Sequence, residues 1–113
     1  MALFAKKQVL VRIEAKLEWK VMRDPESGAW IGACPALNLN AVGDTWIDFQ
    51  QCADETLDLL LRDLFNTGEL HAFLREHGWR SVNELPPPGT HVRFDVPFET
   101  RRARFEDLVP AGA

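Results

Sequence analysis

The sequence has little of what several classes of protein require. Its two cysteines, Cys34 and Cys52, are spaced for neither a metal site nor a redox motif, so we expect buried free thiols in a reducing compartment. Residues 1–7 lack the apolar core of a signal peptide, and no stretch approaches the roughly 20 apolar residues of a membrane span. We therefore expect a cytoplasmic protein without a membrane partner.

The sequence also lacks an excess of positive charge and any glycine-rich phosphate loop. The 113 residues carry a formal net charge of −4, and the pI is about 5.3. A protein that binds nucleic acid by itself is expected to present a basic face, so direct DNA binding is not predicted. The negative charge is compatible with a basic protein partner. No cofactor is predicted.

What the chain does contain is enough apolar material for one modest core. Hydrophobic residues make up 46% and charged residues 27% of the sequence, which is typical of a globular protein. We expect one α+β domain over residues 1–100, followed by a short basic tail over residues 101–113.

Alternating apolar and polar residues predict strands in the first part of the chain. Odd positions from 9 to 21 are apolar, and even positions from 12 to 20 are charged, which indicates one long half-buried strand with a bend or bulge. A turn over 24–28 leads to a second strand over 29–34, and a third strand is expected over 37–42. These strands form an antiparallel meander.

A long helix from Trp46 to Phe65 is the most secure structural prediction. Gly43 permits a tight turn before it, and Asp44 is a polar group of that turn. Thr45 is placed as the N-cap, and Asp48 three residues later completes a capping box. The turn and the cap together define how the chain enters the helix.

The long helix has one apolar stripe and one polar face. On the polar face, Asp58 and Arg62 are spaced for an i,i+4 ion pair. The stripe consists of Phe49, Ala53, Thr56, Leu57, Leu60, Leu61 and Leu64. We expect this stripe to cover one face of the meander.

The rest of the chain predicts a short helix over 69–77 and a fourth strand over 91–98. Gly78 is placed as a left-handed cap of the short helix, and Trp79 as the residue that folds back on it. The predicted fold is therefore an α+β domain: a three-stranded antiparallel meander, one long helix on one face, a short second helix and a fourth strand.

This order of elements resembles the HicB-type antitoxin family between about Trp19 and Trp79. The matching features are the turn over 24–28, the strand end Ala33-Cys34-Pro35-Ala36-Leu37, the helix entrance Gly43-Asp44-Thr45 and the segment 68–78. The resemblance implies a truncated RNase H-like fold without catalytic carboxylates, which binds and blocks a small basic toxin that cleaves messenger RNA. The residues after Phe98 are too few for the C-terminal DNA-binding module of many members, so no repressor role is expected.

Candidate catalytic residues have simpler structural interpretations. His71 and His77 are six residues apart, whereas two metal ligands on one helix are usually three or four apart. Four carboxylates suggest a two-metal nuclease instead: Asp24, Asp44, Asp48 and Glu55. The turn and the helix entrance already account for three of them, so neither a metal nor an enzyme is predicted. A degenerate RNase H-like hydrolase remains an alternative.

A stoichiometric binding function is the preferred hypothesis. Acidic groups at Asp24 and Glu26 could meet the basic groups of a HicA-like toxin, and Trp30 is an aromatic candidate contact. Exposed edge strands also predict a homo-oligomer. The alternative in the same structural class is a solitary oligomeric HicB-like accessory or regulatory domain without a toxin partner.

Overall fold

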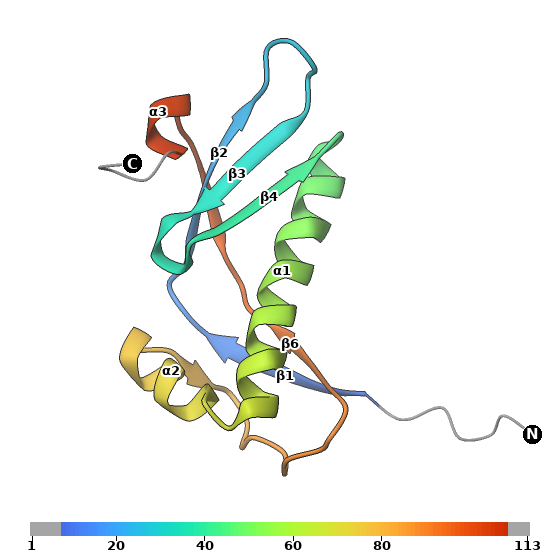
Figure 1. The fold of residues 1–113 in the computed structure, drawn as a ribbon, viewed down its shortest axis with the longest axis vertical. Coiled ribbons are helices and arrows are strands. Elements are labelled where there is room, and N and C mark those ends of the chain that lie inside the picture. Colours follow the sequence, from blue (N-terminus) through green and yellow to red (C-terminus); the bar gives the residue numbers. More distant parts are fainter. Residues whose placement is uncertain (1–7, 109–113) are drawn as a thin grey trace, which may run out of the picture. The chain divides into compact units, whose positions relative to one another are not determined.

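The computed structural model describes residues 8–108 as a mixed α+β protein, in which seven strands form two sheets (Figure 1). Contacts divide the described chain into two compact units, and each unit combines two stretches that are distant in sequence. Unit 1 contains the described residues up to Ala15 together with Leu57–Val96. Unit 2 contains Lys16–Thr56 together with the described residues from Pro97 onward.

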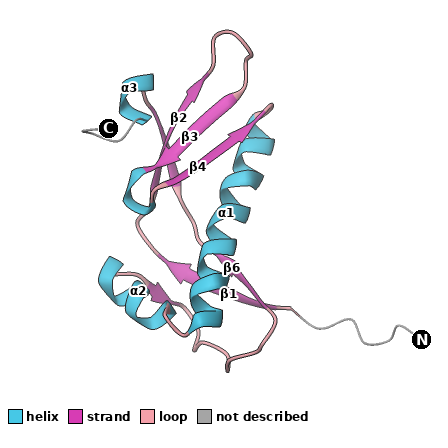
Figure 2. Cartoon of the chain, in the orientation of Figure 1, coloured by secondary structure: helices cyan, strands magenta, loops and turns pink. Residues whose placement is uncertain are grey.

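Unit 2 contains the predicted antiparallel meander, extended by a fourth strand. Strands β2 (Glu18–Arg23), β3 (Trp30–Cys34) and β4 (Leu39–Gly43) pair in sequence order, and β7 (Glu99–Arg102) lies parallel to β2 (Figure 2). The strand order is therefore β4-β3-β2-β7. A short helix, α3 (Phe105–Leu108), follows β7.

The first half of helix α1 (Trp46–Thr67) packs on one face of this sheet. Phe49 is fully buried, and its ring lies edge-on to Trp19 with the ring centroids 6.1 Å apart. A Cβ atom on Gly32 would lie 2.5 Å from the Phe49 ring, so the small residue in β3 provides the space that this ring occupies. The predicted helix and its apolar stripe are confirmed in this unit.

Two strand boundaries were predicted wrongly. The expected long strand over 9–21 is two strands, β1 (Val9–Glu14) and β2, which belong to different sheets. The third strand begins at Leu39 instead of 37, because Pro35–Leu37 forms a 3-10 helix that ends with Asn38 in the left-handed region at φ 55°. Apolar alternation continues through the break between β1 and β2, so periodicity alone could not reveal it.

Unit 1 contains a second, three-stranded sheet with the order β5-β1-β6. Strand β6 (Val92–Asp95) is the predicted fourth strand, shorter than expected, and it pairs in parallel with β1. Strand β5 (Arg80–Ser81) pairs antiparallel with β1 on the other side. The core of this unit includes Val11, Ile13, Leu57, Leu61, Phe65, Leu70, Leu74, Trp79, Val92, Phe94 and Val96.

The predicted end of helix α2 (Leu70–His77) is confirmed in detail. Gly78 has φ 68°, and its N–H donates to the carbonyls of Arg75 and Leu74. The N–H of Trp79 donates to the Leu74 carbonyl over 2.8 Å, and the Trp79 ring contacts Phe73 edge-on. This is the hydrogen-bond pattern of a Schellman motif with its hydrophobic contact.

Asp58 was placed on the exposed face of α1, and the structure places it in the core of unit 1. Its side chain is fully buried and forms ion pairs with Arg62 at 2.8 Å and Arg93 at 3.3 Å. It also accepts the backbone N–H of Phe94 over 2.7 Å. The predicted i,i+4 pair with Arg62 is present, and β6 covers it because the two halves of α1 bury different arcs of the helix.

Candidate protein-binding surface

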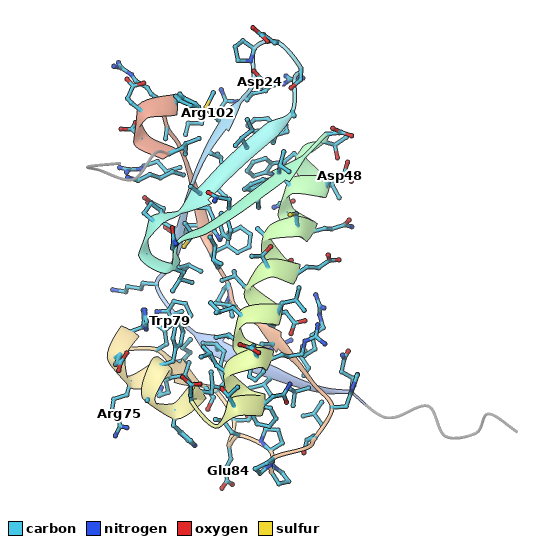
Figure 3. The ribbon with its side chains drawn as sticks, viewed as in Figure 1. Asp24, Asp48, Arg75, Trp79, Glu84 and Arg102 are labelled. Carbon is cyan, nitrogen blue, oxygen red and sulfur yellow. The ribbon has the colours of Figure 1, made fainter. Side chains whose placement is uncertain are left out.

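The entrance to α1 has the Thr45 half of the predicted capping box. The hydroxyl oxygen of Thr45 accepts the backbone N–H of Asp48 over 3.1 Å, which satisfies one of the free donors of the first turn. The carboxylates of Asp44 and Asp48 are exposed. Figure 3 shows Asp48 on the side of α1 that is turned away from the sheet of unit 2.

Gly43 is required at this entrance for a different reason from the one expected. Its φ is not among the positive values found in residues 8–108, so it does not supply a left-handed turn. A Cβ atom there would collide with the backbone nitrogen of Phe49 and lie 2.6 Å from the carbonyl carbon of Asp48. Glycine therefore allows the first turn of α1 to pack directly against the end of β4.

Asp24 organises the hairpin between β2 and β3. Its carboxylate accepts the Ser27 hydroxyl over 2.7 Å and the backbone N–H groups of Glu26 and Ser27 over 3.2 and 3.4 Å. These bonds, with that of the Ser27 hydroxyl the largest, hold the pKa of Asp24 below its usual value. Asp24 therefore stays ionised at neutral pH at the tip of the hairpin (Figure 3). The Glu26 side chain is exposed on the same tip.

Trp30 is half-buried in a cluster with Trp46 and two arginines. Its ring lies 4.9 Å from the Trp46 ring, and the guanidinium carbons of Arg23 and Arg102 lie 5.9 and 5.4 Å from its centroid. Both arginines are close enough for cation–π attraction. Trp30 therefore supports the packing of unit 2 on one side and has cationic neighbours on the other. The sequence pattern does not predict strand β7, so it gives no indication that Arg102 lies next to Trp30.

The exposed side of the first three turns of α1 is acidic and contains one prominent apolar side chain. Ile47, Asp48, Gln51 and Glu55 follow one another at helical spacing, and Asp44 lies in the turn just before the helix. All five residues are exposed, and Ile47 is 65% exposed. We call these five residues the acidic helix face. They were not predicted as a surface, although the sequence contains the signal.

That signal is a long stretch without basic residues. From position 24 to position 61 the chain contains no Lys, Arg or His. The same stretch contains seven carboxylates: Asp24, Glu26, Asp44, Asp48, Asp54, Glu55 and Asp58. Because Asp58 is buried and paired with arginines, the acidic charge that reaches the surface of this stretch is concentrated in unit 2.

The carboxylates of the nuclease alternative have separate structural roles. Asp24 holds its turn, and the backbone of Asp48 belongs to the helix cap. Within residues 8–108, no group of three or more His, Cys, Asp or Glu side chains is placed to hold a metal ion. The Nδ1–H group of His77 donates a hydrogen bond to the Phe73 carbonyl, 2.9 Å away, at the end of α2.

Unit 1 contains an open hollow that is partly cationic. The hollow encloses about 850 Å³ and its lining includes Arg75, Trp79 and Arg80 (Figure 3 labels the first two). Arg80 is already paired with Glu14, whose carboxylate lies 2.6 Å from its guanidinium. This pairing lowers the net positive charge of the hollow, so it is a weaker candidate for binding a charged partner than the acidic helix face.

The fold and surface described above define a mixed α+β protein with an acidic and partly apolar helix face. No family model, curated protein or solved structure matches the chain, so the comparisons neither support nor oppose the resemblance to the HicB family. In the part of the chain that the structure describes, no helix is sufficiently long and apolar to span a membrane.

Proposed function

We propose that this chain is a non-catalytic binding protein that resembles the antitoxin of a HicA/HicB-type pair. In this proposal it neutralises a small basic toxin by covering the surface that cleaves RNA. The observation that carries the proposal is the acidic helix face, in which Ile47 stands exposed among Asp44, Asp48 and Glu55. Charges of one sign beside an apolar side chain favour a partner that is of opposite charge and partly apolar.

The acidic groups and the apolar group have different roles in such a complex. Carboxylates at the rim of an interface mainly accelerate association with a basic partner and exclude acidic ones. Burial of Ile47, which is 65% exposed in the free chain, supplies apolar contact area that slows dissociation. The ring of Trp46 packs against Trp30 and Phe49, so Ile47 is the apolar anchor of this face.

The three contact residues proposed from the sequence contribute unequally. Glu26 is exposed and can pair with a cation, so it remains a candidate contact. Asp24 contributes charge, but its oxygens already accept three hydrogen bonds within the turn. Trp30 has Arg23 and Arg102 against its ring, so a basic partner would have to displace them. We therefore place the centre of the interface on α1.

The test is co-expression with the protein encoded by the adjacent reading frame, scored by growth rescue and by co-purification. The double variant Asp44→Lys/Glu55→Lys is expected to lose both, because it reverses two charges on the acidic helix face. The matched control is Asp63→Lys/Glu76→Lys, which makes the same charge change at exposed positions of unit 1 and should retain rescue. Failure of the unmodified chain to rescue growth from a toxic neighbour would contradict the proposal.

Two outcomes would favour the alternatives. If the chain associates with no neighbouring product and forms a homo-oligomer, it is a solitary accessory or regulatory domain. If it cleaves an RNA–DNA hybrid in the presence of a divalent metal, and substitution of Asp44 or Asp48 abolishes this activity, it is a hydrolase.

A further inference from the structure

The two edges of the sheet in unit 2 differ in how they are protected. Edge strands expose unpaired backbone groups, and proteins usually protect them with charges, proline, bulges or short length. The β7 edge carries Glu99, Arg101 and Arg102, all exposed, and follows Pro97. The β4 edge has the sequence Leu-Asn-Ala-Val-Gly, which contains neither charge nor proline.

The edges of the sheet in unit 1 also carry protective features. Strand β5 is two residues long. Strand β6 is capped from the side by Asp58, which accepts the backbone N–H of Phe94. Of the four sheet edges within residues 8–108, β4 is the one for which the structure shows none of these features. An edge of this kind is a site where another strand can add.

We propose that the β4 edge accepts an extended, basic segment of the partner as an additional strand. The inference rests on the proposed function, because it specifies how a basic partner binds. The backbone of Leu39–Gly43 would provide affinity by pairing with the added strand. Side chains on the two faces of the sheet would select the sequence of that strand.

One face of the added strand would meet an apolar row. Met22, Ile31 and Val42 are direct cross-strand neighbours on the sheet face opposite α1. Met22 and Ile31 are half-buried, and Val42, at the edge, is 57% exposed. Helix α3 lies near the next row and the start of β4, since Leu108 lines one cavity with Ala33 and Asn40. Val42 is not part of this cavity and stays exposed. Apolar side chains on an added strand would extend this row.

On its other face, the end of the added strand beside Gly43 would lie near the carboxylates at the start of α1. Two residues, Asp44 and Thr45, separate β4 from the start of α1 (Figure 1). The backbone of Asp48 packs against Gly43, so Asp44 and Asp48 both lie near the end of this strand. Because successive side chains of a strand point to opposite faces, the complementary sequence alternates basic and apolar residues. This pattern defines the chemistry of the segment.

A second copy of this chain fits the edge less well. A two-fold pairing of β4 with β4 would place both α1 helices on the same face of one continuous sheet. Each helix would bring Asp44, Asp48 and Glu55, and no basic residue occurs between 24 and 61 to compensate for them. Like charges held together in this way oppose association, whereas a basic segment is attracted.

The experiment uses the full chain labelled for NMR and a peptide of about eight residues that alternates Lys and Val, long enough to span one strand. Amide exchange within Leu39–Gly43 should slow at least about tenfold, as expected when edge amides become hydrogen-bonded, with shift changes at β4 and the first turn of α1. A Glu-Val peptide should not bind. A Lys-Val peptide with N-methylated amides, which keeps the charges but cannot pair, should not bind either.

Protein variants separate this inference from the proposed function. Val42→Lys adds a charge at the open edge and should weaken binding of the peptide and of the co-purified neighbour at least about tenfold. Thr100→Lys adds the same charge at an exposed position of β7 and should leave both within about twofold, as for surface substitutions outside an interface.

Three results would overturn the inference. If the neighbour binds the chain and Val42→Lys equally, and the β4 amides stay unprotected in the complex, the edge is not the docking site while the proposed function stands. If no neighbour binds, the proposed function fails as well. If the unmodified chain forms a homodimer, Val42→Lys is monomeric and the Lys-Val peptide does not bind, the occupant is a second copy.

Discussion

At the scale of single residues, the absence of one side chain determines how β4 connects to α1. Gly43 has an ordinary φ, yet the backbone of Phe49 and Asp48 occupies the space of a Cβ atom. This close approach brings the N-cap Thr45 and the acidic helix face directly after the edge strand. Glycine is therefore required here for close packing. A larger residue would have to displace the helix backbone, because backbone atoms, unlike a side chain, cannot move aside by a change of rotamer.

Gly43→Ala is expected to lower the free energy of unfolding by about 3 kcal/mol, the upper end of the range for overpacking. Gly68→Ala is the matched control, because Gly68 has φ 79° but nothing within 4 Å of its missing Cβ. That change should cost about 1 kcal/mol through backbone strain alone. Urea unfolding followed by circular dichroism measures both, and equal losses would contradict the packing argument.

At the scale of elements, α1 shows that one helix can bury two different arcs. Its first half buries Phe49 and Ala53, whereas its second half also buries Asp58, which belongs to the polar face by sequence. The burial of this charge is compensated by two arginines and by the N–H of Phe94 at the edge of β6. Removal of Asp58 would leave the charges of Arg62 and Arg93 without their buried partner.

Asp58→Ala is expected to lower the free energy of unfolding by about 3 kcal/mol, the lower end of the range for a broken buried pair. The loss is limited because Arg62 and Arg93 remain 34% and 40% exposed and water can screen them. Hydrogen exchange at the Phe94 amide should accelerate, since its acceptor is removed. Asp63→Ala, at an exposed position of the same helix, should change stability by less than about 0.5 kcal/mol. A similar loss in both variants would contradict the role given to Asp58.

At the scale of the whole molecule, the distribution of charge is more informative than the net charge of −4. The stretch from 24 to 61 has no basic residue, whereas Arg101, Arg102 and Arg104 follow one another closely near the end of the chain. A basic partner is therefore attracted to one part of the surface in preference to the rest. The rate of association is the quantity that reports this attraction.

The association rate of the basic partner recovered by co-expression should fall at least about tenfold between roughly 0.05 and 0.5 M salt, because salt screens exposed charges. The dissociation rate should change much less, since Ile47 and the backbone of β4 do not depend on charge. Stopped-flow fluorescence measures the association rate. In the Asp44→Lys/Glu55→Lys variant the association rate should depend less on salt concentration. An unchanged salt dependence in that variant would mean that other charges attract the partner.

Local patterns in the sequence were sufficient for much of the fold. The meander, the long helix with its Thr45 cap, and the Gly78 termination of α2 each depend on residues close together in the chain, so periodicity and capping rules predict them. The acidic stretch was equally readable, since it requires only a count of charges. The position of the acidic residues on an exposed helix face beside an open edge could not be predicted, because it depends on how the helices and strands pack on one another.

What the tertiary structure alone decided is the pairing of distant segments. The break between β1 and β2, the addition of β7 to the meander and the burial of Asp58 all arise from contacts between residues far apart in sequence. Apolar alternation indicates that a residue faces a core but not which core. The alternation over residues 9–21 therefore continues through β1 and β2, although these strands belong to different sheets. The sequence by itself determined the local elements and the charge, and long-range pairing determined which edge and which helix face remain open for a partner.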